Sequence, residues 1–307
     1  MAERPRHILG MRDLSRQDIS KILLLAKKFK KEKNPPLSLK GKTVINLFFE
    51  PSTRTRTSFE IAAKKLGAST INFNAPQSST VKGETLIDTA KNIEAMNADF
   101  IIIRHHSSGA PHLLSQVLTI PIINAGDGFH EHPSQALLDI LTIEEHKKRL
   151  SGLNVLVVGD IAHSRVARSN IYGLQKMGAK VIVCGPPTLI PPLVEKLGVK
   201  VFYNLRQAVK EVDVIMMLRV QSERQEFVQF PTYREYIEGY CLNSKTLEHA
   251  KRDIIIMHPG PLNRGVEIAP EIADGPYSVI LNQVSNGVVI RMALLHFLNG
   301  GKSGTLH

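Results

Sequence analysis

The chain has 307 residues, a length typical of about two domains of ~150 residues each. Its hydrophobic content of 43% and charged content of 22% are those of an ordinary folded protein and exclude a disordered or collagen-like chain. Lys and Arg outnumber Asp and Glu by 39 to 28, for a formal charge of +11. Because aromatic residues make up only 6% and Trp is absent, we expect this charge to attract small anions rather than nucleic acid.

The cellular location is predicted from the lack of a membrane-spanning run and of a secretory signal. No apolar run approaches the ~18 residues that cross a bilayer, and the N-terminus has no apolar core of a secretory signal. The two cysteines, Cys184 and Cys241, are too few for a disulfide framework or a structural zinc site. We therefore expect a soluble cytoplasmic protein with no membrane partner.

Strands and helices alternate in the first part of the chain. Ser15 is a typical N-cap for a helix to about residue 33, which Pro35 and Pro36 end. The segments that follow are predicted as strand 43–49, helix 53–66, strand 69–73, helix 84–96 and strand 100–104. Short strands that alternate with helices indicate βαβ units and a parallel sheet.

A long helix, 133–150, leads into a second alternating series. Its predicted strands are 154–158, 180–184, 212–218 and 253–257, and its helices are 166–177, 191–197 and 289–298. The pattern predicts an α/β fold with two doubly wound parallel-sheet domains joined by interdomain helices. We place the first domain at residues 1–132 and 288–307, and the second at 133–287.

The segment Ser52-Thr53-Arg54-Thr55 opens a predicted helix directly after a strand. A helix start carries unpaired N–H groups and the positive end of the helix dipole, which together favour an anion. The three hydroxyls add donors, and Arg54 offers a planar fork suited to phosphate. Arg56 lies two residues further on, on another face of the helix, and we expect it to be structural.

Two further signals lie in the first domain. Arg104 follows a strand, at the end where open α/β sheets bind ligands. His132 precedes Pro133, a good first helical residue, and Gln135 lies about one turn along. A neutral imidazole and an amide can both hydrogen-bond a polarised carbonyl oxygen or an amide group.

Neither a metal nor a cofactor is expected. His130 and His132 lie too close in sequence to converge at a helix start, and no third metal ligand is evident beside them. The loop after strand 154–158 resembles a dinucleotide-binding turn but lacks its three glycines. We therefore expect catalysis that depends on positioning the substrates and on electrostatic stabilisation of the transition state.

The second domain contributes arginines and a rigid turn. Arg165 and Arg219 each follow a predicted strand, where they can hold a carboxylate or form ordinary ion pairs. The turn His258-Pro259-Gly260-Pro261 can aim backbone carbonyls at a ligand or simply close the sheet.

These motifs together resemble the aspartate/ornithine carbamoyltransferase family. Residues 52–56 resemble its carbamoyl-phosphate signature, and residues 132–135 resemble its His-Pro-x-Gln element. Segments 81–85 and 218–224 resemble the lysine loop and aspartate-binding segment of the aspartate-specific members. Residues 258–261 also favour those members, because ornithine enzymes typically carry a cysteine-containing element there.

The resemblance implies an enzyme that transfers the carbamoyl group of carbamoyl phosphate to L-aspartate in pyrimidine biosynthesis. It makes the first domain the carbamoyl-phosphate domain and the second the aspartate domain. The implied phosphate ligands are Ser52, Thr53, Arg54 and Thr55. The groups implied to polarise the carbonyl oxygen are Thr55, Arg104 and His132. The groups implied at the carbamoyl amine are Gln135 and the backbone of Gly260 and Pro261. The implied aspartate ligands are Lys82, Arg165, Arg219 and Gln221.

The family also implies a homotrimer with shared active sites, to which Ser78 and Lys82 would come from the neighbouring subunit. Whether a regulatory chain or a dihydroorotase is a partner stays open. The alternatives are an ornithine-type or other carbamoyltransferase and a non-enzymatic basic α/β protein. For the reaction we expect attack by the aspartate amine, with the leaving phosphate accepting its proton.

Overall fold

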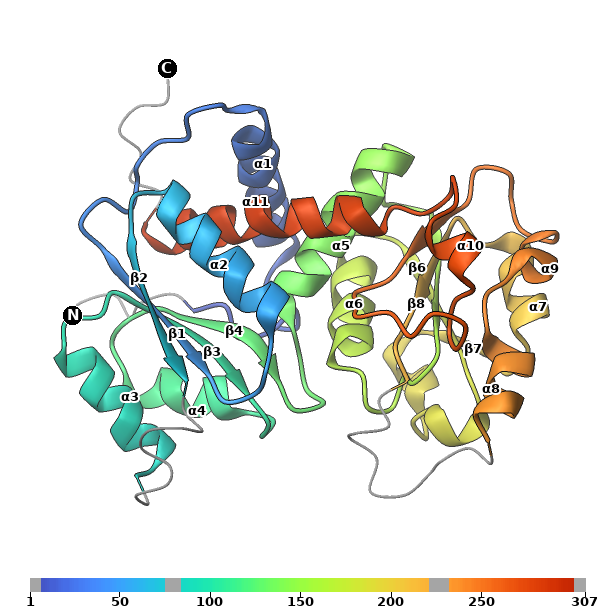
Figure 1. Cartoon of the computed structure of the whole chain (residues 1–307), viewed down its shortest axis with the longest axis horizontal. Coiled ribbons are helices and arrows are strands. Elements are labelled where there is room, and N and C mark those ends of the chain that lie inside the picture. The colour runs from blue at the N-terminus through green and yellow to red at the C-terminus, as the bar shows by residue number, and fades with distance from the viewer. Residues whose placement is uncertain (1–6, 75–83, 221–231, 301–307) are drawn as a thin grey trace. The chain divides into compact units, whose positions relative to one another are not determined.

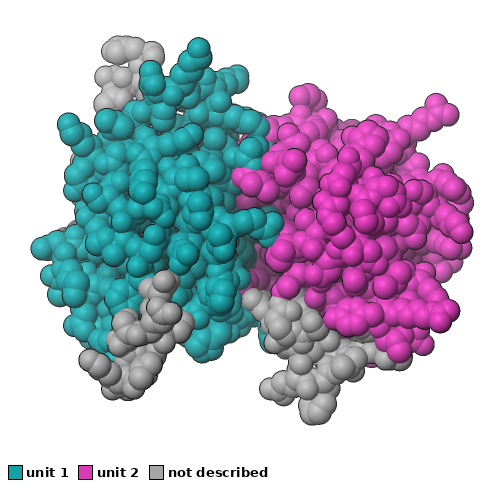
Figure 2. Space-filling view, viewed as in Figure 1, with its two compact units in different colours: residues 1–137, 285–307 teal, residues 138–284 magenta. Residues whose placement is uncertain are grey.

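The computed structural model describes residues 7–74, 84–220 and 232–300. The chain divides into two compact units, coloured separately in Figure 2. Unit 1 comprises Met1–Leu137 and Ser285–His307, and unit 2 comprises Leu138–Val284. Two helices, α5 (Pro133–Lys147) and α11 (Ile280–Leu298), each contribute residues to both units. The chain thus passes from one unit to the other within helices, as expected of interdomain helices.

Unit 1 is built on a parallel four-stranded sheet with the order β2-β1-β3-β4. Its strands are β1 (Thr43–Phe48), β2 (Ser69–Asn74), β3 (Phe100–His105) and β4 (Ile122–Asp127). The apolar residues that begin β3 are buried on both faces, as is usual for a central parallel strand. Because all four strands are parallel, their carboxyl ends lie at the same edge of the sheet, and the predicted ligand residues follow these ends.

Helices cover both faces of this sheet. They are α1 (Arg16–Lys31), α2 (Thr53–Lys65), α3 (Leu86–Ala95) and α4 (Ala110–Val117). Figure 1 shows α2 on one face and α3 with α4 on the other. The predicted Ser15 cap of α1 is confirmed: Ser15 and Asp18 form a reciprocal capping box. The doubly wound arrangement predicted from the sequence is thereby confirmed for unit 1.

Unit 2 holds a parallel five-stranded sheet with the order β7-β6-β5-β8-β9. Its strands are β5 (Asn154–Val158), β6 (Lys180–Cys184), β7 (Lys200–Phe202), β8 (Val214–Met217) and β9 (Ile255–Met257). Its helices are α6 (Arg165–Lys176), α7 (Leu205–Ala208), α8 (Tyr233–Tyr240), α9 (Ser244–Leu247) and α10 (Pro270–Ala273). In Figure 1, α6 and α7 lie on opposite faces of this sheet.

Several elements differ from the sequence prediction. The helix expected at 191–197 is wrong, because only a 3-10 turn, Val194–Leu197, forms there. Two prolines lack the N–H groups of a longer helix, and Leu193 has a left-handed backbone. The last helix begins at Ile280 rather than at residue 289, and its polar first turns concealed that start. The elements that were not predicted are strands β4 and β7 and helices α4, α7, α8, α9 and α10.

The buried polar side chain of Gln283 explains the early start of α11. Gln283 is only 2% exposed. Its Oε1 accepts a hydrogen bond from the His258 N–H at 2.9 Å, and its Nε2 donates to Asp139 Oδ1 at 2.8 Å. Polar residues with such partners can lie on the buried face of a helix, so a pattern based on apolar spacing misses them.

Among the described helices, none has the length and apolar character needed to traverse a membrane.

Candidate active site

The junction between β1 and α2 has an N-cap serine that does not cap. Ser52 is the N-cap residue of α2, yet its side chain makes no capping hydrogen bond. In the other described helices with Ser, Thr or Asn at this position, the side chain accepts from a first-turn N–H. The first-turn N–H groups of a helix have no intrahelical acceptor, and in α2 the Ser52 side chain does not supply one.

Side chains at this junction are partly open to solvent. Thr53 and Arg54 are exposed, Ser52 is half-buried, and Thr55 is buried. The inner face of α2 is anchored by Phe59, which is fully buried and lies under the Arg291 guanidinium at 4.9 Å from the ring centroid. The packed inner face holds the first turn in place, so hydroxyls and a guanidinium gather around the free end of the helix dipole.

Arg104 lies beside this helix start. The register of β1 and β3 pairs Phe48 with Arg104. Its Nε lies 3.1 Å from Oε2 of Glu50, and the two side chains are 14% and 17% exposed. Glu50 thus orients a guanidinium at the same sheet edge as α2, which adds positive charge where an anion would bind.

His132 and Gln135 are positioned by a tight turn after β4. The turn is closed by Asp127 N–H, which donates to the Glu131 carbonyl at 3.2 Å. Glu131, in turn, accepts the Met11 N–H at 2.7 Å. His132 and Gln135 are 4% and 8% exposed. The Gln135 N–H donates to the His132 carbonyl at 3.0 Å, which places both residues in the first turn of α5.

Electrostatics around this turn are dominated by Asp127, whose side chain is fully buried. Burial by itself raises the pKa of Asp127. Hydrogen bonds from His130, Asn124 and the Gly109 N–H outweigh that effect, so the pKa lies below its ordinary value. The carboxylate is therefore charged at neutral pH. The pKa of nearby His105 is lowered by burial and then by His106, which favours a neutral imidazole.

In unit 2, two predicted arginines follow adjacent strands. Arg165 is the first residue of α6 and is 3% exposed, while Arg219 follows β8 and is half-buried. The Leu218 N–H donates to the Val158 carbonyl at 2.8 Å, which joins the ends of β8 and β5. The fold therefore brings both arginines to one edge of the second sheet, where guanidinium groups can bind a carboxylate.

A buried pair supports the turn after β9. His258 and Glu267 have fully buried side chains, and His258 Nε2 lies 3.1 Å from Glu267 Oε1. His258 Nδ1 accepts the Gly260 N–H at 2.7 Å. This bond makes Nε2 the protonated nitrogen, donating to Glu267. The Gly260-Pro261 peptide is cis. Sequence reasoning found this turn but missed Glu267, for which no local motif exists.

Some predicted residues are not placed. Ser78, Lys82 and Gln221 lie outside the described residues. The structure brings Ser52, Thr53, Arg54, Thr55 and Arg104 to one edge of the first sheet. It brings Arg165, Arg219, Gly260 and Pro261 to one edge of the second. Their roles toward a ligand stay predictions.

A separate group of side chains with ligand atoms that could hold a metal ion includes His130 but not His132. His112, Asp127 and His130 each offer a ligand atom, all within 4.8 Å of one another. His112 lies in α4, a helix that was not predicted from the sequence, so no third ligand beside His130 was evident there. His132 is not part of this group.

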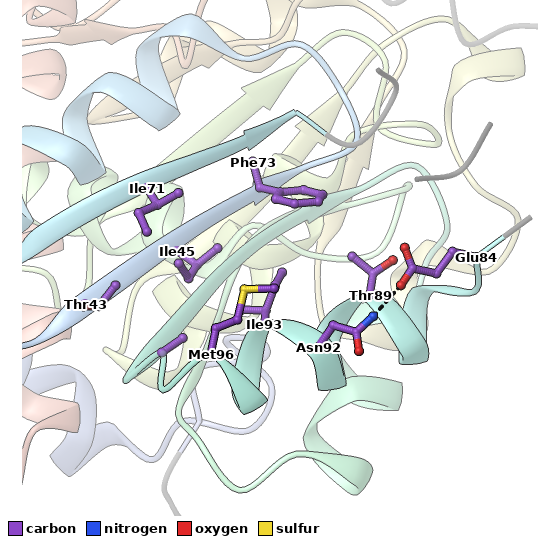
Figure 3. Close-up of a pocket in the computed structure, with 10 residues that line it drawn as sticks. Thr43, Ile45, Ile71, Phe73, Glu84, Thr89, Asn92, Ile93 and Met96 are labelled. Carbon is purple, nitrogen blue, oxygen red and sulfur yellow. Dashed lines mark hydrogen bonds between the residues drawn. The ribbon is translucent and has the colours of Figure 1, made fainter. Parts of the chain in front are cut away.

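An apolar groove of about 210 Å³ lies between α3 and the edge of the first sheet (Figure 3). Ile45, Ile71 and Phe73 line it from the strands, and Ile93 and Met96 from the helix side. Near one end, Asn92 donates to Glu84 at 2.7 Å. The predicted phosphate and carboxylate ligands in the described part of the chain lie elsewhere, and such a lining does not suit a multiply charged anion.

Comparisons with known proteins match both parts of the chain to one family. The chain matches the aspartate/ornithine carbamoyltransferase carbamoyl-P binding domain over residues 6–145 and the Asp/Orn binding domain of that family over 151–298. A relative from Syntrophus aciditrophicus, named aspartate carbamoyltransferase catalytic subunit, is 60% identical over 303 residues, covering 97% of this chain and 98% of the relative.

Solved structures show the same fold. Ornithine carbamoyltransferase from Pyrococcus furiosus matches with a TM-score of 0.88 at 32% identity, covering 99% of this chain and all of that one. Aspartate transcarbamoylase from Trypanosoma cruzi, in complex with carbamoyl phosphate and aspartate, matches with a TM-score of 0.87 at 29% identity, covering 95% and 96%. Motifs, fold and relatives agree, and the chain belongs to the aspartate/ornithine carbamoyltransferase family.

Proposed function

We propose that this chain transfers the carbamoyl group of carbamoyl phosphate to the amine of L-aspartate, giving N-carbamoyl-L-aspartate and phosphate in de novo pyrimidine biosynthesis. The observation that carries the proposal is the uncapped start of α2, which bears the Ser52-Thr53-Arg54-Thr55 motif beside Arg104. The relative from Syntrophus aciditrophicus, which carries an aspartate enzyme's name, supports the choice of second substrate.

The phosphate and the carbamoyl oxygen of carbamoyl phosphate are assigned to residues of unit 1. The first-turn N–H groups of α2, its hydroxyls and Arg54 hold the phosphate dianion. Thr55, Arg104 and His132 donate to the carbamoyl oxygen, where negative charge develops during the reaction. Gln135 and the backbone of Gly260 and Pro261 are assigned to the carbamoyl amine.

Aspartate is assigned to the arginines of unit 2. Arg165 and Arg219 bind its carboxylates, and Gln221 adds a polar contact. The aspartate amine attacks the carbamoyl carbon and forms a tetrahedral oxyanion. The C–O bond to phosphate then breaks, and the leaving phosphate takes the amine proton. Groups that are positioned before the reaction stabilise the oxyanion without reorganisation, so no covalent enzyme intermediate is required.

The second substrate separates this proposal from its nearest alternative. The matching structure from Pyrococcus furiosus is an ornithine enzyme, so the fold alone does not choose between aspartate and ornithine. The chain has Gly260 in its His-Pro-Gly-Pro turn and no cysteine there. Two arginines at the edge of the second sheet suit a dicarboxylate better than a cationic side chain.

The purified chain tests the proposal directly. With carbamoyl phosphate, we expect carbamoylaspartate and equimolar phosphate from L-aspartate, and background phosphate release from L-ornithine. Citrulline formation from ornithine, or no transfer to either amino acid, would contradict the assignment. Omitting the amino acid is the control for spontaneous breakdown of carbamoyl phosphate.

We also propose a cytoplasmic homotrimer in which Ser78 and Lys82 act in the neighbouring subunit's site, with a regulatory chain or a dihydroorotase as candidate partner. Mixing denatured Arg54→Ala and Lys82→Ala chains and refolding them together tests the shared site. If Lys82 serves a neighbour, mixed trimers contain some intact sites and regain activity. Light scattering of the same samples reports the assembly, and mixtures that stay inactive as trimers would exclude sharing.

A further inference from the structure

We propose that His112, Asp127 and His130 form a binding site for a late first-row divalent metal ion such as Zn²⁺. Each residue offers one ligand atom, and these atoms all lie within 4.8 Å of one another. Ligands of a tetrahedral zinc ion lie about 3.3 Å apart, so modest side-chain rotation closes the group around an ion. Two imidazoles and one carboxylate are a donor set that suits Zn²⁺, Co²⁺ and Ni²⁺.

Asp127 is held as a ligand by its surroundings. Its side chain is fully buried. Oδ1 accepts from Asn124 Nδ2 at 2.8 Å and from the Glu131 N–H at 3.1 Å, while Oδ2 accepts from the Gly109 N–H at 2.7 Å. These outer contacts fix the carboxylate in one orientation, as in metal sites whose ligands are oriented by a second layer of hydrogen bonds.

The closed turn after β4 positions His130 next to Asp127. Its backbone N–H donates to the Asp127 carbonyl at 2.9 Å, and its Nδ1 lies 3.0 Å from Asp127 Oδ2. A ligand nitrogen and a ligand oxygen at this separation already match neighbouring positions of one coordination shell. Binding the ion through Nδ1 displaces the proton shared with Asp127.

His112 completes the group from the first turn of α4. Its Nε2 lies 3.4 Å from Oδ2 of Asp13, a carboxylate that can orient the ring. Its Nδ1 is buried, and no hydrogen-bond partner for it lies among the residues that the structure describes. A buried nitrogen with an uncommitted lone pair is costly unless something binds it, and a carboxylate on the other nitrogen is the usual companion of a metal-bound imidazole.

The group is also accessible. The His112 and His130 side chains are 36% and 29% exposed, so an ion can enter and water can occupy the remaining coordination positions. The rings of the two histidines meet edge to face, with centroids 5.4 Å apart. A bound ion would join the first turn of α4 to the turn after β4, two elements of unit 1.

A matched control lies in unit 2. Asp160 and His163 repeat the spacing and geometry of Asp127 and His130: His163 Nδ1 lies 2.8 Å from Oδ1 of a fully buried Asp160. In the described part of the chain, this pair has no third ligand grouped with it. It therefore separates a three-ligand metal site from an ordinary His-Asp pair.

Metal titration of the purified full chain tests the site. After chelator treatment, we expect one Co²⁺ per chain by equilibrium dialysis, with the visible absorption of low-coordinate cobalt, and displacement by Zn²⁺. His112→Ala removes a ligand from another element and should weaken binding by at least ~100-fold, the upper end of what losing an outer contact costs. His163→Ala should bind like the parent.

A second variant and a second readout keep the test decisive. His130→Gln should lose Co²⁺ binding as His112→Ala does, and Zn²⁺ should raise the thermal unfolding midpoint of the parent but of neither variant. Carbamoyl transfer by His112→Ala shows that this variant is folded, because His112 has no assigned role in the reaction. Absence of binding by the parent, or equal binding by the parent and both variants, would overturn the proposal.

Discussion

The β1–α2 junction of unit 1 and the β5–α6 junction of unit 2 follow one plan, in which a parallel strand leads through a short turn to a helix with a serine N-cap. Ser52 makes no capping bond, whereas Ser164 accepts the Ala167 N–H at 3.1 Å. The residues that follow differ as well: Arg54 is exposed, and Arg165 is 3% exposed.

The two junctions illustrate two ways in which the start of a helix can bind an anionic ligand. Where the serine caps the helix, the first-turn donors are partly satisfied, and the junction acts through the arginine it carries. Where the serine does not cap, its side chain does not compete with an anion for the first-turn N–H groups. This difference agrees with the assignment of a phosphate dianion to α2 and of a carboxylate to Arg165.

The largest expected effect comes from Arg54. Arg54→Ala should lower kcat by roughly 10²- to 10³-fold, since it removes a charged donor from the group that stabilises the transition state. Initial rates of carbamoylaspartate formation measure the change. Arg56→Ala is the matched control, because Arg56 was assigned a structural role. An Arg56 variant as impaired as the Arg54 variant would refute the division of roles.

Arg165 should change substrate binding more than turnover. Arg165→Ala should raise the KM for aspartate about 30-fold, equivalent to about 2 kcal/mol, because a carboxylate loses its buried partner. The KM for carbamoyl phosphate should change far less. Arg168, one turn along α6 and half-buried, provides the control. If Arg165→Ala affected both KM values equally, the assignment of aspartate to this junction would be wrong.

The two serines should differ in stability. Ser164→Ala should cost about 1 kcal/mol of unfolding free energy, because it removes a capping bond. Ser52→Ala should leave the unfolding midpoint almost unchanged and instead weaken carbamoyl phosphate binding. Urea unfolding with and without carbamoyl phosphate measures both effects. Equal destabilisation by the two substitutions would show that Ser52 caps α2 in solution.

The smallest effect concerns the exposed side of α2. Hydrogen bonds from Lys64 and then Asn72 hold the pKa of Glu60 below its ordinary value of 4.5. A lowered carboxyl pKa contributes stability that is complete above 4.5 and is lost as pH falls through the folded value. Because the pair is solvent-screened, Glu60→Gln should cost under ~0.5 kcal/mol at neutral pH. Urea midpoints at neutral and acidic pH test this, and a loss that persisted in acid would require a different cause.

Local signals were sufficient for much of the fold. The strands β1, β3, β5 and β6 are short apolar runs, and the cap at Ser15 lies next to the helix it starts. Such patterns depend on neighbouring residues, so they can be read without tertiary structure. The motif at 52–55 is local for the same reason, since it lies between a strand end and a helix start that both follow from nearby residues.

Elements that depend on distant partners were missed. Gln283 extends α11 because it binds the backbone of His258 and the side chain of Asp139, which no spacing rule detects. Glu267 likewise supports the Gly260 turn through His258. A buried polar group is stable only where it has a hydrogen-bond partner, and in these cases the partner comes from a distant part of the chain.

The sequence by itself determined the alternating strands and helices, the place of the 52–55 motif at a helix start and the resemblance to a carbamoyltransferase. Only the tertiary structure decided that Ser52 leaves its helix uncapped, that Glu50 orients Arg104, and that His112 meets Asp127 and His130. The reason is physical: propensity and capping signals act over a few residues, whereas a side chain's partners are set by which elements the fold packs together.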